Sequence, residues 1–307
     1  MSFRAALLSS TILSAAFMGA AVAAEKPPST TAVDGINGKV EALGGAYTSK
    51  GLYGAAGSLS VPLGQQFGAQ IDATAADFNK RFFGVIGGHL FWRDPRKGLL
   101  GITGDYLNWD QFGGVHVGHF GGEGEAYLGR VTLRGVAGVE WGNNKVVSTT
   151  GTISTAVTGG TLFTTTTTPM LGNVSRFYDR VAVDYYFTDN WRGTIGHRYT
   201  SGTHKLTFGT EYAFALNRGM MASLFGEGRV GEGSKNYGVW GGLRVYFGKS
   251  DKSLIRRHRE DDPDSDTSPD SLFDIVNSMG PPTSTSNTVP TPCPPGEIFL
   301  NGSCQIP

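Results

Sequence analysis

Charged side chains recur at alternate positions of short segments between residues 38 and 248. The polar faces of the first half carry mostly acids, whereas those of the second half carry mostly Arg and Lys with several acids among them. An acidic wall that faces a basic-rich wall across a narrow space makes a transverse field, which sorts ions and orients polar solutes. The alternative is that these charges pair with one another and fill the interior. The candidate lining residues are Glu41, Asp72, Asp105, Glu123, Glu125, Arg134, Glu140, Arg180, Asp184, Arg192, Arg198, Lys205, Glu211, Arg229 and Arg244.

The residue types that catalysis needs are present, but not in a catalytic pattern. A covalent hydrolase needs a nucleophile with a His partner, and the chain lacks the Gly-x-Ser-x-Gly turn. His116 and His119 lie three apart in an expected strand, so they point to opposite faces and cannot chelate one metal ion. His89 and His119 lie on polar faces, but no Ser or carboxylate stands at a spacing that compels a dyad. We therefore expect no enzyme, no metal site and no cofactor.

The two cysteines, Cys293 and Cys304, lie near the end of the chain. An even number of cysteines in an exported chain favours one disulfide. The bond would close a small loop, with its turn at Asn301 and Gly302. Such a loop is either a protease-resistant end or, in a sharper interpretation, a small binding module with almost no core.

Twelve segments alternate apolar and polar residues with a period of two, which is the pattern of strands with one apolar face. In the last of them Val239 and Leu243 share one face, whereas Trp240 and Arg244 share the other. The expected strands are 39–48, 52–62, 67–78, 82–93, 98–108, 114–127, 130–142, 175–187, 191–200, 204–216, 219–230 and 236–247. The pattern predicts an all-β fold, a single antiparallel up-and-down transmembrane β-barrel of about twelve strands, with ten as the alternative. A half-buried sheet of a soluble protein alternates in the same way.

Aromatic residues at the strand ends favour the membrane barrel. Trp and Tyr rings belong at membrane interfaces, where one edge of the ring is apolar and the other wet. The predicted interface aromatics are Trp92, Trp109, Trp141, Trp191 and Phe247, whereas Trp240 should point into the lumen. The alternative is that they are ordinary core aromatics.

The connections between the expected strands are tight turns at one end and, on average, looser at the other. The longest connection, 143–174, is rich in Thr and we expect it to be a loop. Short turns on the periplasmic side and longer loops outside are typical of outer-membrane barrels.

The chain divides into four expected segments. Arg4, an apolar run from 5 to 19 and small residues at 21–24 predict a signal peptide, 1–24, for export in a Gram-negative cell. A polar linker, 25–37, should precede the barrel, 38–248. The remainder, 249–307, combines a charge block with a Pro-rich run, so we expect a disordered, flexible periplasmic tail with a small Cys loop. One short amphipathic helix could form at 271–279.

The last expected strand also carries a resemblance. Gly242-Leu-Arg-Val-Tyr-Phe247 resembles the insertion signature of bacterial outer-membrane β-barrels, with Gly242, Val245 and Phe247 at the matching positions. The signature usually ends the chain, and here it does not. The stretches 88–101 and 125–141 resemble porin-like barrels of uncharacterised function. The resemblance covers 38–248 and implies a place in the outer membrane, contact with its lipid and insertion by the barrel-assembly machinery.

Together these features predict a porin-like passive channel for small polar solutes. The alternative is a structural or adhesive barrel with a filled lumen, which displays the Thr-rich loop and contacts peptidoglycan or a periplasmic protein through its tail. Acids and bases balance at 26 each, which gives no case for binding nucleic acid.

Overall fold

The structure is a computed structural model that describes residues 29–157, 160–216, 219–232, 236–248, 251–265, 270–290, 292–300 and 303–307. The expected signal peptide, the first four residues of the expected linker, 25–28, and the expected turn at 301–302 lie outside the described residues. Within the described part of the expected linker, Val33 is buried and packs on Phe91 and Leu99.

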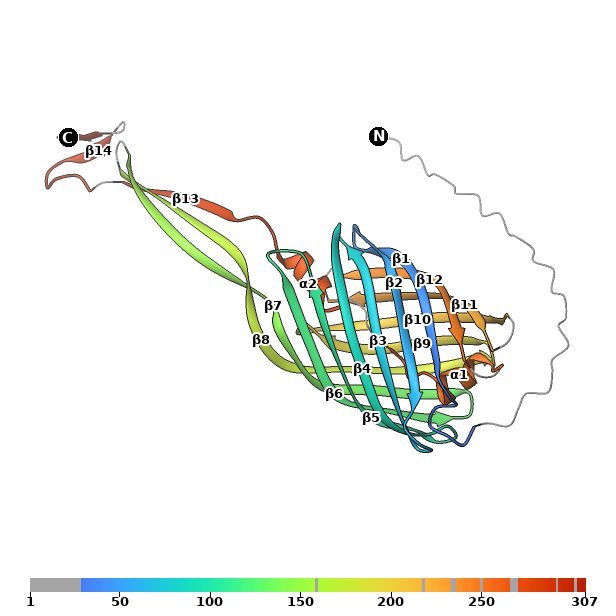
Figure 1. Ribbon diagram of the computed structural model, residues 1–307. Coiled ribbons are helices and arrows are strands. Elements are labelled where there is room, and N and C mark those ends of the chain that lie inside the picture. The colour runs from blue at the N-terminus through green and yellow to red at the C-terminus, as the bar shows by residue number, and fades with distance from the viewer. Residues whose placement is uncertain are drawn as a thin grey trace, which may run out of the picture.

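The barrel is closed and antiparallel (Figure 1). Its strands are β1 (Asn37–Tyr47), β2 (Lys50–Pro62), β3 (Phe67–Phe78), β4 (Arg81–Asp94), β5 (Gly98–Trp109), β6 (Val115–Leu128), β7 (Val131–Val157), β8 (Gly160–Thr188), β9 (Trp191–Thr200), β10 (Thr203–Ala215), β11 (Met221–Gly231) and β12 (Tyr237–Phe247). Each strand pairs with the next, and β12 pairs with β1 so that Phe247 lies opposite Gly38. The predicted up-and-down barrel of twelve strands is confirmed, and the ten-stranded alternative is not what forms.

The two faces of the sheet differ as the alternation predicts. Apolar side chains on the outer face stay exposed, among them Val40, Ile71, Ile86, Leu100, Phe120, Val181, Ile195, Leu224 and Val239. An exposed apolar belt of this extent suits contact with lipid rather than water. Among the described residues, no helix has the length and apolarity that crossing a membrane requires.

The connection expected as a long loop is instead strand. β7 and β8 run on past the barrel as a two-stranded arm, and their register continues from Lys145 opposite Gly172 to Val157 opposite Gly160. The sequence of this arm is rich in Thr and Val, whose branched β-carbons favour extended backbone. The expected sorting of turns also fails, because the β1–β2 turn, 48–49, is as short as the β8–β9 turn, 189–190, at the other end.

We call the end of the barrel where β1 begins the N-side mouth, and the end from which the arm projects the arm-side mouth. Within the tail, which we expected to be disordered and flexible, the described residues include two helices and three short strands. Helix α1 (Leu254–Glu260) lies at the N-side mouth and α2 (Asp270–Ser278) at the arm-side mouth (Figure 1). Beyond them, β13 (Thr283–Pro290) pairs with β8, and the short strands β14 (Ile298–Leu300) and β15 (Ser303–Gln305) pair with each other. A prediction from composition treats the tail as an isolated segment. In the structure, the barrel wall supplies partners for the charged side chains of the tail.

Candidate functional site: the lumen and its plug

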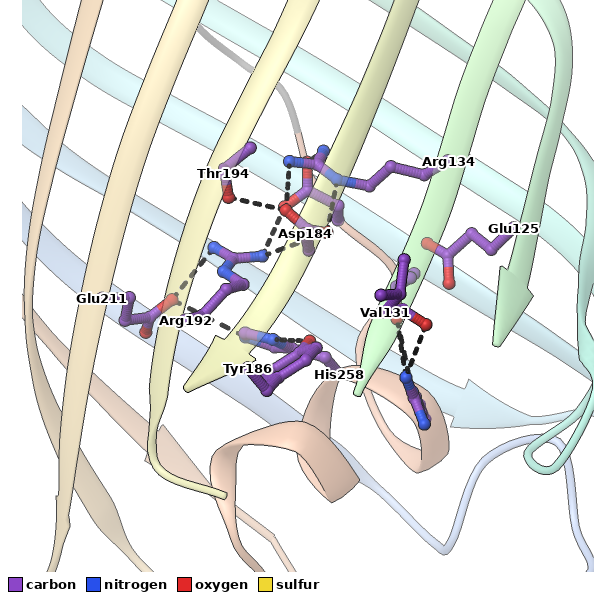
Figure 2. A network of polar contacts seen from close by, with 12 residues as sticks. Glu125, Val131, Arg134, Asp184, Tyr186, Arg192, Thr194, Glu211 and His258 are labelled. Atoms are coloured by element: carbon purple, nitrogen blue, oxygen red, sulfur yellow. Dashed lines mark hydrogen bonds and ion pairs between the residues drawn. The ribbon is translucent and has the colours of Figure 1, made fainter. Parts of the chain in front are cut away.

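Residues 251–265 and 270–279, here called the plug, lie against the inner wall of the barrel. At the N-side mouth α1 is held by three different parts of the rim. The backbone N–H of Leu254 donates to Asn190 Oδ1 at 2.9 Å, and Arg257 Nη2 donates to the carbonyl of Gly219 at 2.6 Å. Arg259 Nη2 donates to the carbonyl of Val131 at 3.0 Å (Figure 2). The helix therefore ties together the β8–β9 turn, the β10–β11 connection and the start of β7.

A histidine of α1 points into the lumen between two tyrosines. The Tyr186 hydroxyl lies 2.8 Å from His258 Nδ1, and His258 Nε2 lies 3.1 Å from the Tyr246 hydroxyl. His258 belongs to the plug, outside the membrane-spanning strands, and burial, with Arg192 nearby, lowers its pKa well below the usual value. A neutral ring fits these contacts, because Nδ1 then accepts from Tyr186 while Nε2–H donates to Tyr246. Figure 2 shows this ring beside Glu211, whose Oε1 accepts from Tyr246 at 2.7 Å.

The plug adds one acid to the basic-rich wall. Asp264 forms ion pairs with Arg134 and with Arg192, the latter at 3.7 Å. Both arginines also pair with Asp184, at 2.8 Å and 3.8 Å, and Thr194 donates to the same carboxylate at 2.6 Å (Figure 2). The positive charges of β7 and β9 are thus shared between a wall carboxylate and the plug.

The acids of the other wall find histidine partners. His89 lies between Asp72, at 3.1 Å, and Glu123, at 2.7 Å. His119 lies between Asp105, at 2.7 Å, and Glu140, at 3.0 Å. Hydrogen bonds of this kind satisfy buried carboxylates without a basic wall opposite.

Further pairs lie on the lumen face. Arg244 joins Glu41 across the closing seam at 2.5 Å and reaches Glu211 at 3.0 Å, and Arg192 also pairs with Glu211 at 3.1 Å. Arg180 lies 3.6 Å from Asp105 and Arg176 2.6 Å from Glu140.

The other predicted lining residues are also on the inner face. Glu125 accepts from Tyr127 at 2.7 Å, Lys205 donates to the carbonyl of Thr200 at 3.0 Å, and Arg198 lines a lumen cavity. Arg229 lies over the Trp240 ring at 4.7 Å. The inner face therefore carries paired charges, which is the alternative that the alternation left open, rather than two opposed walls across an open space.

At the arm-side mouth the plug is held by aromatic rings. Phe273 of α2 stacks on Tyr47, with ring centroids 3.7 Å apart, and meets Phe78 at 5.3 Å and Trp240 at 6.0 Å. Aromatic side chains of strands β12, β1 and β3 thus pack on α2, and Phe273 is completely buried.

Four of the five predicted interface aromatics lie on the outer face of the barrel, and the fifth faces inward. Trp141 and Trp191 are exposed on the outer face, and Trp92 and Phe247 lie half-buried there. Trp109 was predicted at the interface, but only 1% of it is exposed, and its Nε1 donates inward to the carbonyl of Phe78 at 3.2 Å. The alternation of β5 explains the error: Trp109 is four residues from Asp105, so both side chains lie on the inward face of the strand.

One cluster imitates a hydrolase triad. Ser271 Oγ lies 3.4 Å from His119 Nε2, and His119 Nδ1 lies 2.7 Å from Asp105. However, Glu140 approaches the same Nε2 more closely, at 3.0 Å, and Ser271 Oγ donates to Glu140 at 3.2 Å, so the serine hydroxyl is bonded to the carboxylate and not aligned on the histidine. The cluster holds α2 against the wall.

Small cavities remain between the plug and the wall. One, of about 80 Å³, is lined by basic and acidic side chains that include Lys39, Arg192, Arg198, Arg229, Glu41 and Asp264. A second, of about 50 Å³, lies beside Glu123, Arg134 and Arg180. Volumes of this size hold a few water molecules, so the plug nearly closes the passage here.

Sequence reasoning missed the plug residues, above all His258, Asp264 and Phe273. The available signals were the acidic run at 260–264, which complements the basic strands, and the apolar positions of 271–279. The predicted disulfide joins Cys293 to Cys304. No metal-binding group of three or more His, Cys, Asp or Glu side chains occurs in the part of the chain that the structure describes.

No family model matches the chain, and no curated protein matches it. Solved structures do. The KdgM porin has a TM-score of 0.39 and 8% identity over 69% of this chain and 99% of its own. The translocator domain of the autotransporter NalP from Neisseria meningitidis has a TM-score of 0.43 and 10% identity over 70% and 90%. The CymD monoaromatic hydrocarbon channel has a TM-score of 0.37 and 9% identity over 72% and 89%.

These identities and TM-scores are too low to bear on activity, so the fold is taken from the strand pairing itself. The chain therefore has the architecture of an outer-membrane β-barrel, with twelve strands around a lumen that its own C-terminal segment occupies.

Proposed function

We propose that the protein is a porin-like channel of the bacterial outer membrane that its own C-terminal plug closes. The observation that carries the proposal is that the plug, and not the side chains of the wall, fills the lumen. Eight strands make an interior that side chains alone can fill, so twelve strands leave a space. Here residues such as Asp264 and Phe273 occupy that space.

The location rests on the exposed apolar belt and on the last strand. Val245 and Phe247 of β12 lie on the outer face, as an insertion signature requires. Gly242 faces inward where the strands approach closely, because a Cβ there would meet the carbonyl oxygen of Ala42 at 1.9 Å. The proposed cell is Gram-negative, and the proposed surroundings are outer-membrane lipid and the barrel-assembly machinery.

The proposed solutes are small and polar, because charged side chains line the passage. Neutralising Arg134, Arg180 and Arg198 together by substitution with Gln should shift the ion preference of the unplugged barrel toward cations. Removing three positive charges from a narrow lumen lowers the potential that attracts anions. Reversal potentials in asymmetric salt, recorded from a chain that stops after Gly248, measure the shift.

The matched control changes two cations outside the lumen. Arg96 and Lys97 lie in the β4–β5 turn, with side chains 70% and 79% exposed. Their substitution by Gln should leave the reversal potential nearly unchanged, since exposed charges are screened by salt. An equal response to both sets would show that the lumen charges do not govern permeation.

A second candidate function is a structural or adhesive barrel whose lumen stays filled. The small cavities and the projecting β7–β8 arm favour it. The expected contact of the tail with peptidoglycan or a periplasmic protein belongs to this second candidate, and it requires the arm-side mouth, where the tail leaves the plug, to face the periplasm.

A further inference from the structure

The C-terminal segment begins and ends at opposite mouths of the barrel. β12 ends at the N-side mouth, where Phe247 lies opposite Gly38 at the start of β1. Helix α1 follows directly and covers this mouth through the backbone of the rim: the N–H of Asp34 donates to the carbonyl of Glu260 at 3.2 Å.

The next residues lie inside the barrel. Ser60 Oγ donates to Asp262 Oδ1 at 3.0 Å, and Gln70 Nε2 donates to the carbonyl of Pro263 at 3.2 Å. Asp264 then pairs with arginines of β7 and β9 on another part of the wall. Ser60 and Gln70 lie on the lumen face near the N-side ends of β2 and β3 and are almost completely buried, so these contacts lie inside the barrel just past the N-side mouth.

The segment then reaches the arm-side mouth. Ser271 Oγ donates to Glu140 Oε2 at 3.2 Å, and Ser201, in the β9–β10 turn of this mouth, donates to the carbonyl of Ser271 at 3.0 Å. Phe273 lies against Tyr47, the last residue of β1. The described residues of this segment therefore contact the lumen face at both ends of the barrel.

Beyond the mouth the chain continues on the arm. β13 pairs with β8 from Thr283 opposite Thr167 to Pro290 opposite Gly160, as Figure 1 shows. Hydroxyl pairs reinforce the ladder, with Thr166 and Ser284 at 2.9 Å and Thr164 and Ser286 at 3.1 Å. Thr and Ser dominate this three-stranded extension, with Ile153 and Met170 among its few exposed apolar side chains, so it suits water rather than lipid.

We propose that the barrel carries its own C-terminus outward through the lumen and displays residues 283–307 on the cell surface beside the arm. The inference rests on the outer-membrane location proposed above. An even number of strands places both ends of a barrel on the periplasmic side, and the long connections of such barrels project outside. The N-side mouth then faces the periplasm and the arm-side mouth faces the medium, so the disulfide-closed loop from Cys293 to Cys304 is a surface module.

The test places a short epitope tag after Pro307 of the full chain and stains intact cells with an antibody that cannot cross the outer membrane. The tag should be stained without permeabilisation, and equally to a tag inserted between β7 and β8 at 158–159. A tag in the β4–β5 turn, 95–97, should be stained only after the outer membrane is opened. Heat-modifiable gel mobility of each tagged chain in the outer-membrane fraction shows that the barrel has folded.

Two outcomes would overturn the inference. If the arm tag is stained on intact cells but the C-terminal tag is not, the tail stays inside, while the channel proposal stands. If the β4–β5 tag is stained on intact cells and the other two are not, the orientation is reversed. Recovery of the protein outside the outer-membrane fraction would instead refute the location that both proposals share.

Discussion

Stopping the chain after Gly248 is expected to convert a barrel with little conductance into an open pore. The described plug residues contact both mouths, and the cavities beside Asp264 measure about 80 Å³, 50 Å³ and 10 Å³. Its removal frees a lumen that twelve strands make too wide for the wall side chains to fill. The closing seam between β12 and β1 uses no residue of the tail, so the barrel should still form. Planar-bilayer recordings of the two purified chains measure the difference.

A chain that stops after Met279 is the matched control. It loses β13 and the disulfide loop but keeps α1, α2 and their contacts with the wall. We expect it to conduct as little as the full chain. Equal conductance of all three chains would mean that the plug does not close the passage, provided that each shows the gel mobility of a folded barrel.

Replacing Glu211 with Gln should destabilise the barrel by about 3–5 kcal/mol, the usual cost of removing one partner from a buried charge pair. Glu211 is completely buried. Its carboxylate lies 3.0 Å from Arg244 and 3.1 Å from Arg192, and accepts from Ser223 at 2.6 Å. An amide would remove one negative partner from each of two buried guanidinium groups, leaving Arg244 with Glu41 and Arg192 with more distant carboxylates. Urea unfolding of the protein in lipid vesicles measures the loss.

Glu227 provides the comparison on the same inner face. Its side chain is 37% exposed and lies 3.5 Å from Arg229, so replacing it with Gln should cost less than about 1 kcal/mol. Similar losses for the two substitutions would show that the network around Glu211 is as hydrated as an exposed pair, and that the lumen is not closed there.

The sequence could predict the strands because period-two alternation is a local property. Val239 and Leu243 face outward and Trp240 and Arg244 inward, as the pattern of β12 required. The same alternation also predicts that Trp109 faces inward, because it lies an even number of residues from the inward-facing Asp105. The arm at 143–174 was misjudged because Thr and Gly suggested a loop, whereas two Thr-rich stretches can pair with each other.

The plug could not be predicted by local reasoning. Asp264 and Arg134 are 130 residues apart, and Asp262 and Ser60 are 202 apart. A charge block is disordered when it lacks partners, and its partners here exist only after the barrel closes. Alternation also predicted that the charged side chains of the strands face inward. It could not predict whether they pair with one another or face each other across an open lumen, because that depends on which residues meet in the closed barrel.

The most direct test of the central claim, that the tail occupies the lumen from mouth to mouth, is thiol cross-linking in intact membranes. Both native cysteines are first replaced with Ser, and two matched cysteine pairs are then introduced separately. The first pair is Ser60→Cys with Asp262→Cys, whose native side chains hydrogen-bond at 3.0 Å. The second is Tyr47→Cys with Phe273→Cys, whose native rings stack with centroids 3.7 Å apart. A short bifunctional thiol reagent should join both pairs within one chain, and should leave the mismatched pair of Ser60→Cys and Phe273→Cys unjoined. Failure of both matched pairs in a folded barrel, or equal joining of the mismatched pair, would contradict the threaded plug.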